Sequence, residues 1–377
     1  MSELRSAFHQ LAVPGVQTLH PYEPGKPMDE LQREYGLTDI IKLASNENPR
    51  GPGEKALAAA REAMADAHRY PDGNGFRLKQ ALARHHGVAS ETITLGNGSN
   101  DVLALVASTF LGPGREAVFS EHAFAVYPIV TSAAGATACV APALGSDAGM
   151  PCGHDLDAMR ARVTDDTRVV FVANPNNPTG TWLGRRELKA FIQSMPDHVI
   201  VVVDEAYCEY SDSPQQPDAT EWLSAFPNLV VTRTFSKVHG LAGFRVGYSM
   251  AHPAVAELFN RVRQPFNVST SAQAAAEAAL SDTDYVRESV TMNNEQREWL
   301  RGELQQLDLD VLPSAANFLC VRVGDAGAVY EGLLRAGVIV RPVAGYGLPE
   351  WIRVTVGLPD ENRRFLDALT GLMGRRA

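Results

Sequence analysis

The sequence predicts an α/β protein: a three-layer α/β/α large domain with a mostly parallel sheet, followed by a smaller α+β C-terminal domain. The first observation is that short apolar runs alternate with helical patterns from residue 36 onward. The second is that "VIVVV" (199–203) and "NLVVT" (228–232) are almost continuously apolar, as in strands buried on both faces. The third is a change after about residue 270, where long helical patterns precede a few short strands.

Each element is assigned from its local pattern. Apolar, β-branched runs predict strands in the large domain at 91–98, 116–120, 137–142, 168–175, 198–207 and 228–236. Good helix formers between these runs predict helices at 53–70, 76–87, 99–112, 155–163 and 184–195. Toward the C-terminus the same criteria predict helices at 269–282, 285–307 and 326–337 and strands at 317–323 and 351–357.

The length of 377 residues exceeds that of one typical domain, which favours a large domain with a smaller companion. Residues 1–35 are rich in Pro and Gly ("HPYEPGKP"), so we expect an extended N-terminal arm that is part of the small domain. Residues 36–270 are expected to form the large domain, and residues 271–377 the small C-terminal domain.

Composition excludes several classes of protein. The net charge of −10 argues against nucleic acid and an anionic membrane surface as partners. The N-terminus lacks the pattern of a signal peptide, and the apolar runs are too short to cross a bilayer. The four cysteines are scattered, and the ten histidines do not fall in metal-ligand spacing. We therefore expect a cytoplasmic protein with no metal site.

The common catalytic fingerprints, such as a phosphate-binding P-loop, a zinc-protease helix or a nucleophile elbow, do not occur. Attention therefore falls on polar residues that follow predicted strands, because ligands of open α/β sheets lie beyond the carboxyl ends of the strands. In "ITLGNGSND", Gly98, Ser99 and Asn100 would bring backbone N–H groups to a helix N-terminus, which favours a phosphate. An ordinary turn with an N-cap is the alternative.

Two more strand ends carry unusual polar residues. In "VVFVANPNNPTG", neighbouring prolines would hold Asn177 rigidly at the sheet edge, unless the segment is only a stiff loop. In "VIVVVDEAY", Asp204 ends a buried strand, and its desolvation requires a partner such as a cationic ring nitrogen. A structural ion pair or an N-cap would also explain it. Tyr207 approaches the same site if the chain turns helically after Asp204.

The fourth strand end, "TRTFSKVHGLAGFR", contains a lysine among apolar and hydroxyl-bearing neighbours. A partly desolvated Lys237 near other cations would have a lowered pKa and could form an imine with an aldehyde. Arg245 and the hydroxyls of Thr234 and Ser236 could bind a phosphate dianion. A purely structural role explains this stretch equally well by itself. The four ends together, however, offer what one cofactor, pyridoxal 5′-phosphate, requires.

Several motifs support a family resemblance. "NPNNPTG" (174–180), "DEAY" (204–207) and "SKVHGLAGFRVGY" (236–248) resemble, in this order, the aspartate-aminotransferase superfamily of fold-type I pyridoxal-phosphate enzymes. Within it, "SNENPRGP", "RYPDG" and "IVRP…WIRVTVG" are most similar to the histidinol-phosphate aminotransferase family. The resemblance runs nearly end to end. It implies a homodimeric transferase of histidine biosynthesis, which converts L-histidinol phosphate and 2-oxoglutarate to imidazole-acetol phosphate and L-glutamate.

The resemblance also implies roles for particular residues. Lys237 would bond the cofactor covalently and act as the base, and Asp204 would pair with the pyridinium nitrogen. Asn177 and Tyr207 would hydrogen-bond the phenolic oxygen. The cofactor phosphate would be held by Ser99, Asn100, Thr234, Ser236 and Arg245, and by Tyr70 of the neighbouring subunit. Phe124 takes the position of an aromatic ring stacked on the pyridine, where many relatives have Tyr.

Substrate contacts follow from the same resemblance. Arg353 matches an arginine that grips a substrate carboxylate, a contact that suits a planar guanidinium. Arg341 matches a second arginine of the substrate site, and Tyr22 matches a tyrosine of the N-terminal arm. A surface or interface position is the alternative for each of these three residues.

Rival functions share most of the cofactor residues. The nearest are an aromatic amino acid aminotransferase and a threonine-phosphate decarboxylase of the same fold. A non-catalytic regulator that binds the cofactor is a rival from another class. Such regulators carry a fused helix-turn-helix segment, for which the short N-terminal arm leaves no room, and the retained Lys237 also favours catalysis.

Overall fold

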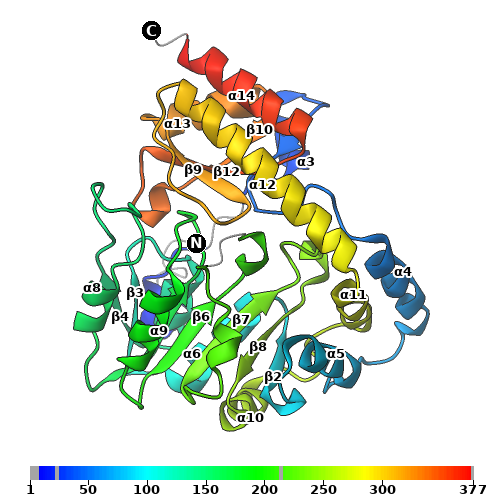
Figure 1. Cartoon of the computed structure of the whole chain (residues 1–377), viewed down its shortest axis with the longest axis vertical. Coiled ribbons are helices and arrows are strands. Elements are labelled where there is room, and N and C mark those ends of the chain that lie inside the picture. Colours follow the sequence, from blue (N-terminus) through cyan, green and yellow to red (C-terminus); the bar gives the residue numbers. More distant parts are fainter. Residues whose placement is uncertain (1–7, 22–24, 212–214, 375–377) are drawn as a thin grey trace.

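The computed structural model describes residues 8–21, 25–211 and 215–374, and it confirms the predicted α/β fold (Figure 1). The large domain is built on a seven-stranded sheet with the order β2-β8-β7-β6-β5-β3-β4. Its strands are β2 (Ile93–Gly96), β3 (Glu116–Ser120), β4 (Thr137–Ala141), β5 (Thr167–Ala173), β6 (Ile200–Asp204), β7 (Leu229–Thr234) and β8 (Gly247–Ala251). All pairs are parallel except the two that β8 makes, with β2 and with β7.

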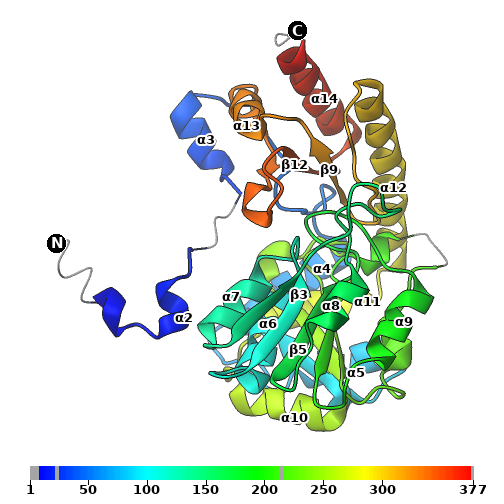
Figure 2. The ribbon, with the colours of Figure 1, turned by 90° about the vertical axis from the view of Figure 1, so that its left-hand side faces the viewer.

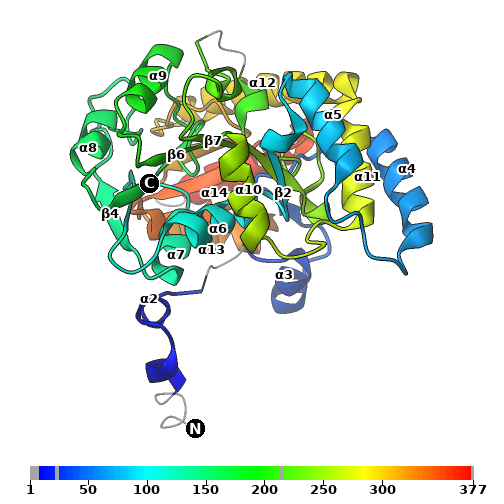
Figure 3. The same ribbon diagram turned by 90° about the horizontal axis from the view of Figure 1, so that it is seen from below.

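Helices cover both faces of this sheet, as the continuous apolar runs predict. Within β5, Val170 and Val172 belong to one core, whereas Val169 and Phe171 belong to the core on the opposite face. The helices are α4 (Glu54–Ala63), α5 (Phe76–His86), α6 (Ser99–Phe110), α7 (Val126–Ala133), α8 (Leu156–Ala161), α9 (Arg185–Gln193), α10 (Pro253–Val262) and α11 (Thr270–Leu280). Figure 3 shows α6 and α7 on one side of the sheet and α5 and α9 on the other.

The C-terminal part of the chain forms a smaller α+β unit above this sheet (Figure 1). Its elements are α12 (Thr283–Gln306), β9 (Phe318–Arg322), α13 (Ala326–Arg335), β10 (Val338–Ile339), β11 (Arg341–Pro342), β12 (Trp351–Thr355) and α14 (Pro359–Met373). β9, β11 and β12 form an antiparallel sheet, and β1 (Ile41–Lys42) pairs in parallel with β10.

The domain boundaries at residues 35 and 270 stay a prediction. The pairing of β1 with β10 favours grouping residues 41–42 with the small domain. The burial of Ala272 and Ala276 of α11 in the same core as Leu78 and Leu82 of α5 favours a second boundary near residue 282, at the start of α12.

The expectation of an extended arm is wrong for residues 28–35, which form α3 (Met28–Tyr35). The acidic residues Asp29 and Glu30 lie in its first turn, where they suit the helix dipole, and Gly36 ends it with a φ of 68°. Leu31 is buried with Leu334 and Ile339 of the small domain. The first described residues, 8–12, project from the body of the molecule, whereas α2 (Pro14–Gln17) lies beside α7 (Figure 2).

The described part of the chain contains neither a candidate membrane-spanning helix nor a candidate metal cluster. None of its helices is both long and apolar enough to span a lipid bilayer. No cluster of three or more His, Cys, Asp or Glu side chains in those residues has the arrangement of a metal site.

A buried ion pair lies next to the carboxyl ends of β6 and β7. The Glu205 carboxylate accepts hydrogen bonds from Nε (3.0 Å) and Nη2 (2.7 Å) of Arg233, whose Nη2 also donates to Asp218. Because Glu205 is 1% exposed, Glu205→Gln would leave a buried guanidinium without its main counter-charge. We expect the free energy of unfolding to fall by about 3 kcal/mol.

Denaturant unfolding of wild type and Glu205→Gln measures the loss in free energy of unfolding. Glu221→Gln is the matched control, because Glu221 pairs with Arg185 at the surface and its removal should cost at most about 1 kcal/mol. Equal losses in the two variants would contradict the expectation.

Candidate active site

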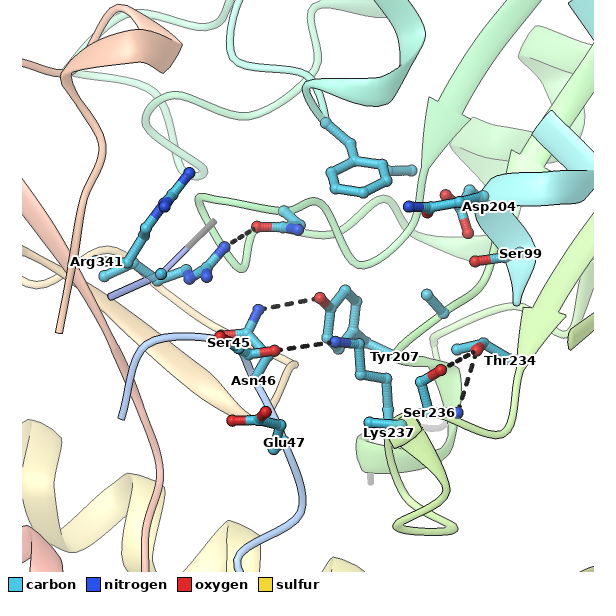
Figure 4. Close-up of a pocket in the computed structure, with 18 of the residues that line it drawn as sticks. Ser45, Asn46, Glu47, Ser99, Asp204, Tyr207, Thr234, Ser236, Lys237 and Arg341 are labelled. Atoms are coloured by element: carbon cyan, nitrogen blue, oxygen red, sulfur yellow. Dashed lines mark hydrogen bonds between the residues drawn. The ribbon is translucent and has the colours of Figure 1, made fainter. Parts of the chain in front are cut away.

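A cavity of about 380 Å³ lies at the carboxyl ends of β5, β6 and β7, between the sheet and the small domain (Figure 4). Most of the residues that the sequence singled out line it together. They are Ser99, Asn100, Phe124, Asn177, Asp204, Tyr207, Thr234, Ser236, Lys237, Arg245, Arg341 and Arg353. The predicted convergence of separate strand ends on one site is therefore observed, whereas the individual roles of the residues stay predictions.

One end of the cavity collects donors that suit a phosphate. Ser99 is the first residue of α6, and Gly98 precedes it with a φ of 77°. A Cβ atom at Gly98 would lie 2.6 Å from Nη2 of Arg245, so only glycine lets the guanidinium approach this helix N-terminus. Nη1 of Arg245 lies 3.4 Å from Oγ of Ser236, which accepts a hydrogen bond of 3.0 Å from Thr234. Hydroxyls, a guanidinium and helix N–H groups thus meet at one point.

Asp204 ends β6 at the floor of the cavity and is 4% exposed. Oδ2 accepts a hydrogen bond of 3.0 Å from the Tyr127 hydroxyl, and Oδ1 accepts one of 3.1 Å from Thr232. Burial raises the pKa of Asp204 above its usual value, while these bonds and the charge of Lys237 act to lower it. A cationic donor in the cavity would stabilise the ionised carboxylate.

Lys237 follows the end of β7 by three residues, and its side chain enters the same cavity as Asp204 (Figure 4). Its Nζ donates to the backbone oxygen of Ser45 at 3.2 Å and lies 5.4 Å from the centroid of the Tyr207 ring. The Tyr207 hydroxyl in turn accepts a hydrogen bond of 3.0 Å from Nδ2 of Asn46. An amine and a phenol thus share the centre of the cavity.

Two arginines of the small domain, Arg341 and Arg353, line the cavity, and Arg341 lies on the side opposite Ser99 (Figure 4). Arg341 of β11 pairs directly with Arg353 of β12, so both side chains share one face of the sheet. Arg353 is 4% exposed and donates from Nη1 to Oδ1 of Asn177 (2.5 Å) and from Nη2 to the oxygen of Ala44 (2.6 Å). Its Nε is buried, with no hydrogen-bond partner among the described residues. Because like charges directly across two strands repel, this arrangement favours an anion between them.

The three predicted aromatic residues Phe124, Tyr70 and Tyr22 differ in their position relative to the cavity. Phe124 lines the cavity, with its ring edge-to-face with Tyr127 at 5.9 Å. Tyr70 does not line it; it is 82% exposed and stacks on Phe266 at 4.7 Å. Its predicted contact with a neighbouring subunit's cofactor stays a prediction. Tyr22 lies outside the described residues.

Sequence reasoning missed several groups that the fold brings to the site. Tyr127 comes from α7, and Ser45 and Asn46 come from the loop after β1. Tyr127 follows Phe124 by three residues, so a helical continuation of that segment could have suggested its approach. Asn46 lies in "SNENPRGP", a segment used only as a cue to the family.

The residues present fit pyridoxal 5′-phosphate. A dianionic phosphate suits the donors around Ser99 and Arg245, and a protonated ring nitrogen suits the buried Asp204 carboxylate. The Lys237 amine can bond an aldehyde carbon, and the Tyr207 hydroxyl is a donor for a phenolic oxygen. The absence of a Cβ atom at Gly98 keeps the Arg245 guanidinium beside the N-terminus of α6, where it can meet a phosphate.

Comparison with known proteins agrees with this site. Residues 38–369 match the family model described as aminotransferase class I and II, and the chain belongs to that family. More particularly, it is 56% identical over 371 residues to "Histidinol-phosphate aminotransferase 2" of Pseudomonas fluorescens (strain Pf0-1). The match covers 98% of this chain and 99% of that relative.

Solved structures extend the likeness to three dimensions. A crystal structure of histidinol-phosphate aminotransferase from Sinorhizobium meliloti, in complex with pyridoxal-5′-phosphate, is 31% identical with a TM-score of 0.88. It covers 97% of this chain and 98% of its own. L-threonine-O-3-phosphate decarboxylase from Porphyromonas gingivalis has a TM-score of 0.77 at 22% identity over 89% of this chain and 100% of its own, which shows a shared fold alone.

Proposed function

We propose that this chain is a pyridoxal 5′-phosphate-dependent aminotransferase that converts L-histidinol phosphate and 2-oxoglutarate to imidazole-acetol phosphate and L-glutamate, reversibly. The observation that carries the proposal is the meeting of Lys237, Asp204 and the Arg341–Arg353 pair in one cavity. The choice of substrate is supported by the full-length identity to relatives named histidinol-phosphate aminotransferase. The amino group moves between an amino alcohol phosphate and a 2-oxo acid, in a step that fits histidine biosynthesis.

When bound, pyridoxal 5′-phosphate supplies an aldehyde carbon that bonds amines and a conjugated ring that accepts an electron pair. Lys237 Nζ would remove the proton from Cα of the amino substrate, and the Ser45 carbonyl, 3.2 Å away, orients this amine. Asp204 would hold a proton on the ring nitrogen, because its buried carboxylate gains a cationic partner there. Tyr127 and Thr232 fix the orientation of that carboxylate.

The other lining residues bind and orient the cofactor. Arg245, the hydroxyls of Thr234 and Ser236, and the α6 N-terminus with Ser99 and Asn100 would hold the phosphate. Asn177 and Tyr207 would hydrogen-bond the phenolic oxygen, and the Phe124 ring would pack on the pyridine face. Together these contacts would keep the reactive carbon near Lys237 and exclude water from one face of the ring.

The arginine pair would serve both substrates. Glutamate and 2-oxoglutarate carry a carboxylate, whereas histidinol phosphate has a phosphate and no α-carboxylate. Planar guanidinium groups bind either anion through two parallel hydrogen bonds. The neighbouring positions of Arg341 and Arg353 support the proposal that one anion site accepts both. Tyr22 of the N-terminal arm is proposed as a further substrate contact.

A homodimer acting in the cytoplasm is the proposed working form. The support for a dimer is the exposed stack of Tyr70 on Phe266, since large apolar groups held together at a surface favour an interface. In the dimer Tyr70 would reach the phosphate of the neighbouring subunit's cofactor. Sedimentation at micromolar concentration tests the assembly.

A half-reaction screen tests the substrate. The protein loaded with pyridoxal 5′-phosphate is mixed separately with histidinol phosphate, glutamate, phenylalanine, tyrosine and threonine phosphate, and the spectral change of the bound cofactor is followed. We expect histidinol phosphate and glutamate to react fastest. Faster reaction with phenylalanine would shift the assignment to an aromatic aminotransferase, and loss of CO₂ from threonine phosphate would indicate the decarboxylase.

A further inference from the structure

Asn46 is held in an unusual conformation at the junction of the two domains. It is 1% exposed and has a φ of 56°, in the left-handed region that costs most side chains free energy. Its backbone oxygen accepts a hydrogen bond of 3.0 Å from Nδ2 of Asn317. Its side chain reaches Tyr207 in the large domain (Figure 4). These contacts hold the Asn46 side-chain amide in one orientation toward Tyr207.

The hydrogen bonds around Asn46 have a defined direction. The Asn46 N–H donates to Oγ1 of Thr355 at 3.0 Å, so the Thr355 hydroxyl donates its own proton to Oδ1 of Asn46 at 3.1 Å. Because Oδ1 accepts, the Nδ2 end of the amide faces Tyr207 and donates to its hydroxyl oxygen at 3.0 Å. The Tyr207 oxygen therefore accepts from Asn46, and its proton is left to point elsewhere.

Tyr207 lines the cavity, so a hydroxyl proton that does not face Asn46 can point into it. The Tyr207 ring packs edge-to-face on Phe318 at 5.3 Å, which limits its movement. The charged groups that face it are Lys237, Arg353 and Asp204. Burial raises the pKa of Tyr207, and Arg353 and the Asn46 hydrogen bond act to lower it, so the hydroxyl keeps its proton at neutral pH.

We propose that Asn46 is a positioning residue, which orients the Tyr207 hydroxyl as a donor into the cavity through the relay Thr355–Asn46–Tyr207. The inference rests on the proposed function, because the acceptor of that proton is the phenolic oxygen of the bound cofactor. The relay starts on β12, two residues from Arg353 on the same face of the strand. It thus connects the strand that carries the substrate arginine to the phenol that contacts the cofactor.

Asn46→Asp tests the direction of the relay. A carboxylate accepts where the amide donates, so it would take the Tyr207 proton away from the cavity while nearly preserving shape. We expect the pH midpoint of the absorbance change of the bound cofactor to rise by about one unit, since the phenolic oxygen loses a donor. The dissociation constant of pyridoxal 5′-phosphate from the protein, measured by fluorescence quenching, should rise about tenfold, and kcat should fall with KM for glutamate little changed.

Comparison variants separate orientation from structure and from charge. Asn46→Ala removes more contacts but leaves the Tyr207 proton free to point inward, so its midpoint shift should be smaller than that of Asn46→Asp. In a Tyr207→Phe background, Asn46→Asp should shift the pH midpoint by less than half of the shift that it causes in wild type. Thr355→Val, which releases the amide, should shift it in the same direction. Thr167→Val, a buried change at the N-terminal end of β5 and remote from the cavity, should lower only the melting temperature.

The outcomes distinguish the two proposals. If wild type binds pyridoxal 5′-phosphate and reacts, but Asn46→Ala shifts the midpoint as much as Asn46→Asp, Asn46 has only a structural role and the inference is overturned. An undiminished effect of Asn46→Asp in the Tyr207→Phe background overturns it as well. If wild type itself neither binds the cofactor nor reacts, the proposed function fails, and the inference fails with it.

Discussion

Replacing Lys237 with alanine is expected to lower kcat by about 10⁴-fold, the upper range for the loss of a positioned general base. Among the described residues that line the cavity, Lys237 carries the one primary amine. Its Nζ, held by the Ser45 oxygen and the Tyr207 ring, is the group placed to take a proton from the substrate. No neighbouring side chain in that lining has both the reach and the basicity to replace it.

Single-turnover spectroscopy with glutamate measures the Lys237→Ala effect. Partial rescue by a small primary amine added to the buffer is expected, because the amine can enter the space that the side chain leaves. Lys55→Ala is the matched control, because Lys55 pairs with Asp282 and neither residue lines the cavity, so this variant should react at nearly the wild-type rate. Retention of more than a tenth of wild-type activity by Lys237→Ala would refute the role of this lysine.

Asp204→Asn is expected to lower kcat by about 10³-fold, the loss seen when a buried electrostatic contact in an active site is removed. An amide cannot stabilise a proton on the ring nitrogen as a carboxylate does. The Tyr127 and Thr232 hydroxyls already donate to both oxygens, so the amide N–H₂ would also face a donor. Tyr127→Phe keeps the carboxylate and should cost only about tenfold.

The melting temperature of Asp204→Asn shows whether its loss of kcat comes from misfolding. Burial raises the folded-state pKa of Asp204 above its unfolded value, so above that pKa the ionised carboxylate destabilises the cofactor-free fold. Removing the charge with Asn should therefore offset the donor–donor contact of the new amide, and the melting temperature of the cofactor-free protein at pH 8 should stay close to that of wild type. Adding cofactor should stabilise wild type more than Asp204→Asn. A variant that is both inactive and strongly destabilised without cofactor would contradict this account.

The fold could be predicted largely because its strands are buried on both faces. The run at 199–203 is apolar at every position, and the structure places alternate residues of β6 in opposite cores. β8 was not predicted as a strand, and "GYSMA" also contains no signal of strand direction. Its place between β2 and β7 depends on tertiary packing, including the absence of a Cβ atom at Gly247, which would lie 2.5 Å from the Ser99 nitrogen.

The site residues that directly follow an apolar strand could be predicted from the sequence. The contacts between distant segments could not. Asp204 and Lys237 follow apolar runs, which marks them in the sequence. Asn46 contacts Thr355 across 309 positions, and the direct pairing of Arg341 with Arg353 depends on the connection between β11 and β12. Such contacts arise from the arrangement of the two domains, which local patterns do not describe.

The insertion of β8 between β2 and β7 sets an order of events during synthesis. Ser99 is synthesised early, but Arg245, which lines the same cavity, and the strand β8 are complete only at residue 251. The phosphate-binding end can then assemble, whereas Arg353 is made about a hundred residues later. At a translation rate of about 5–20 residues per second, this delay lasts about 5–20 s. A nascent chain would thus gain the groups proposed to retain the cofactor before it gains those proposed to bind a substrate.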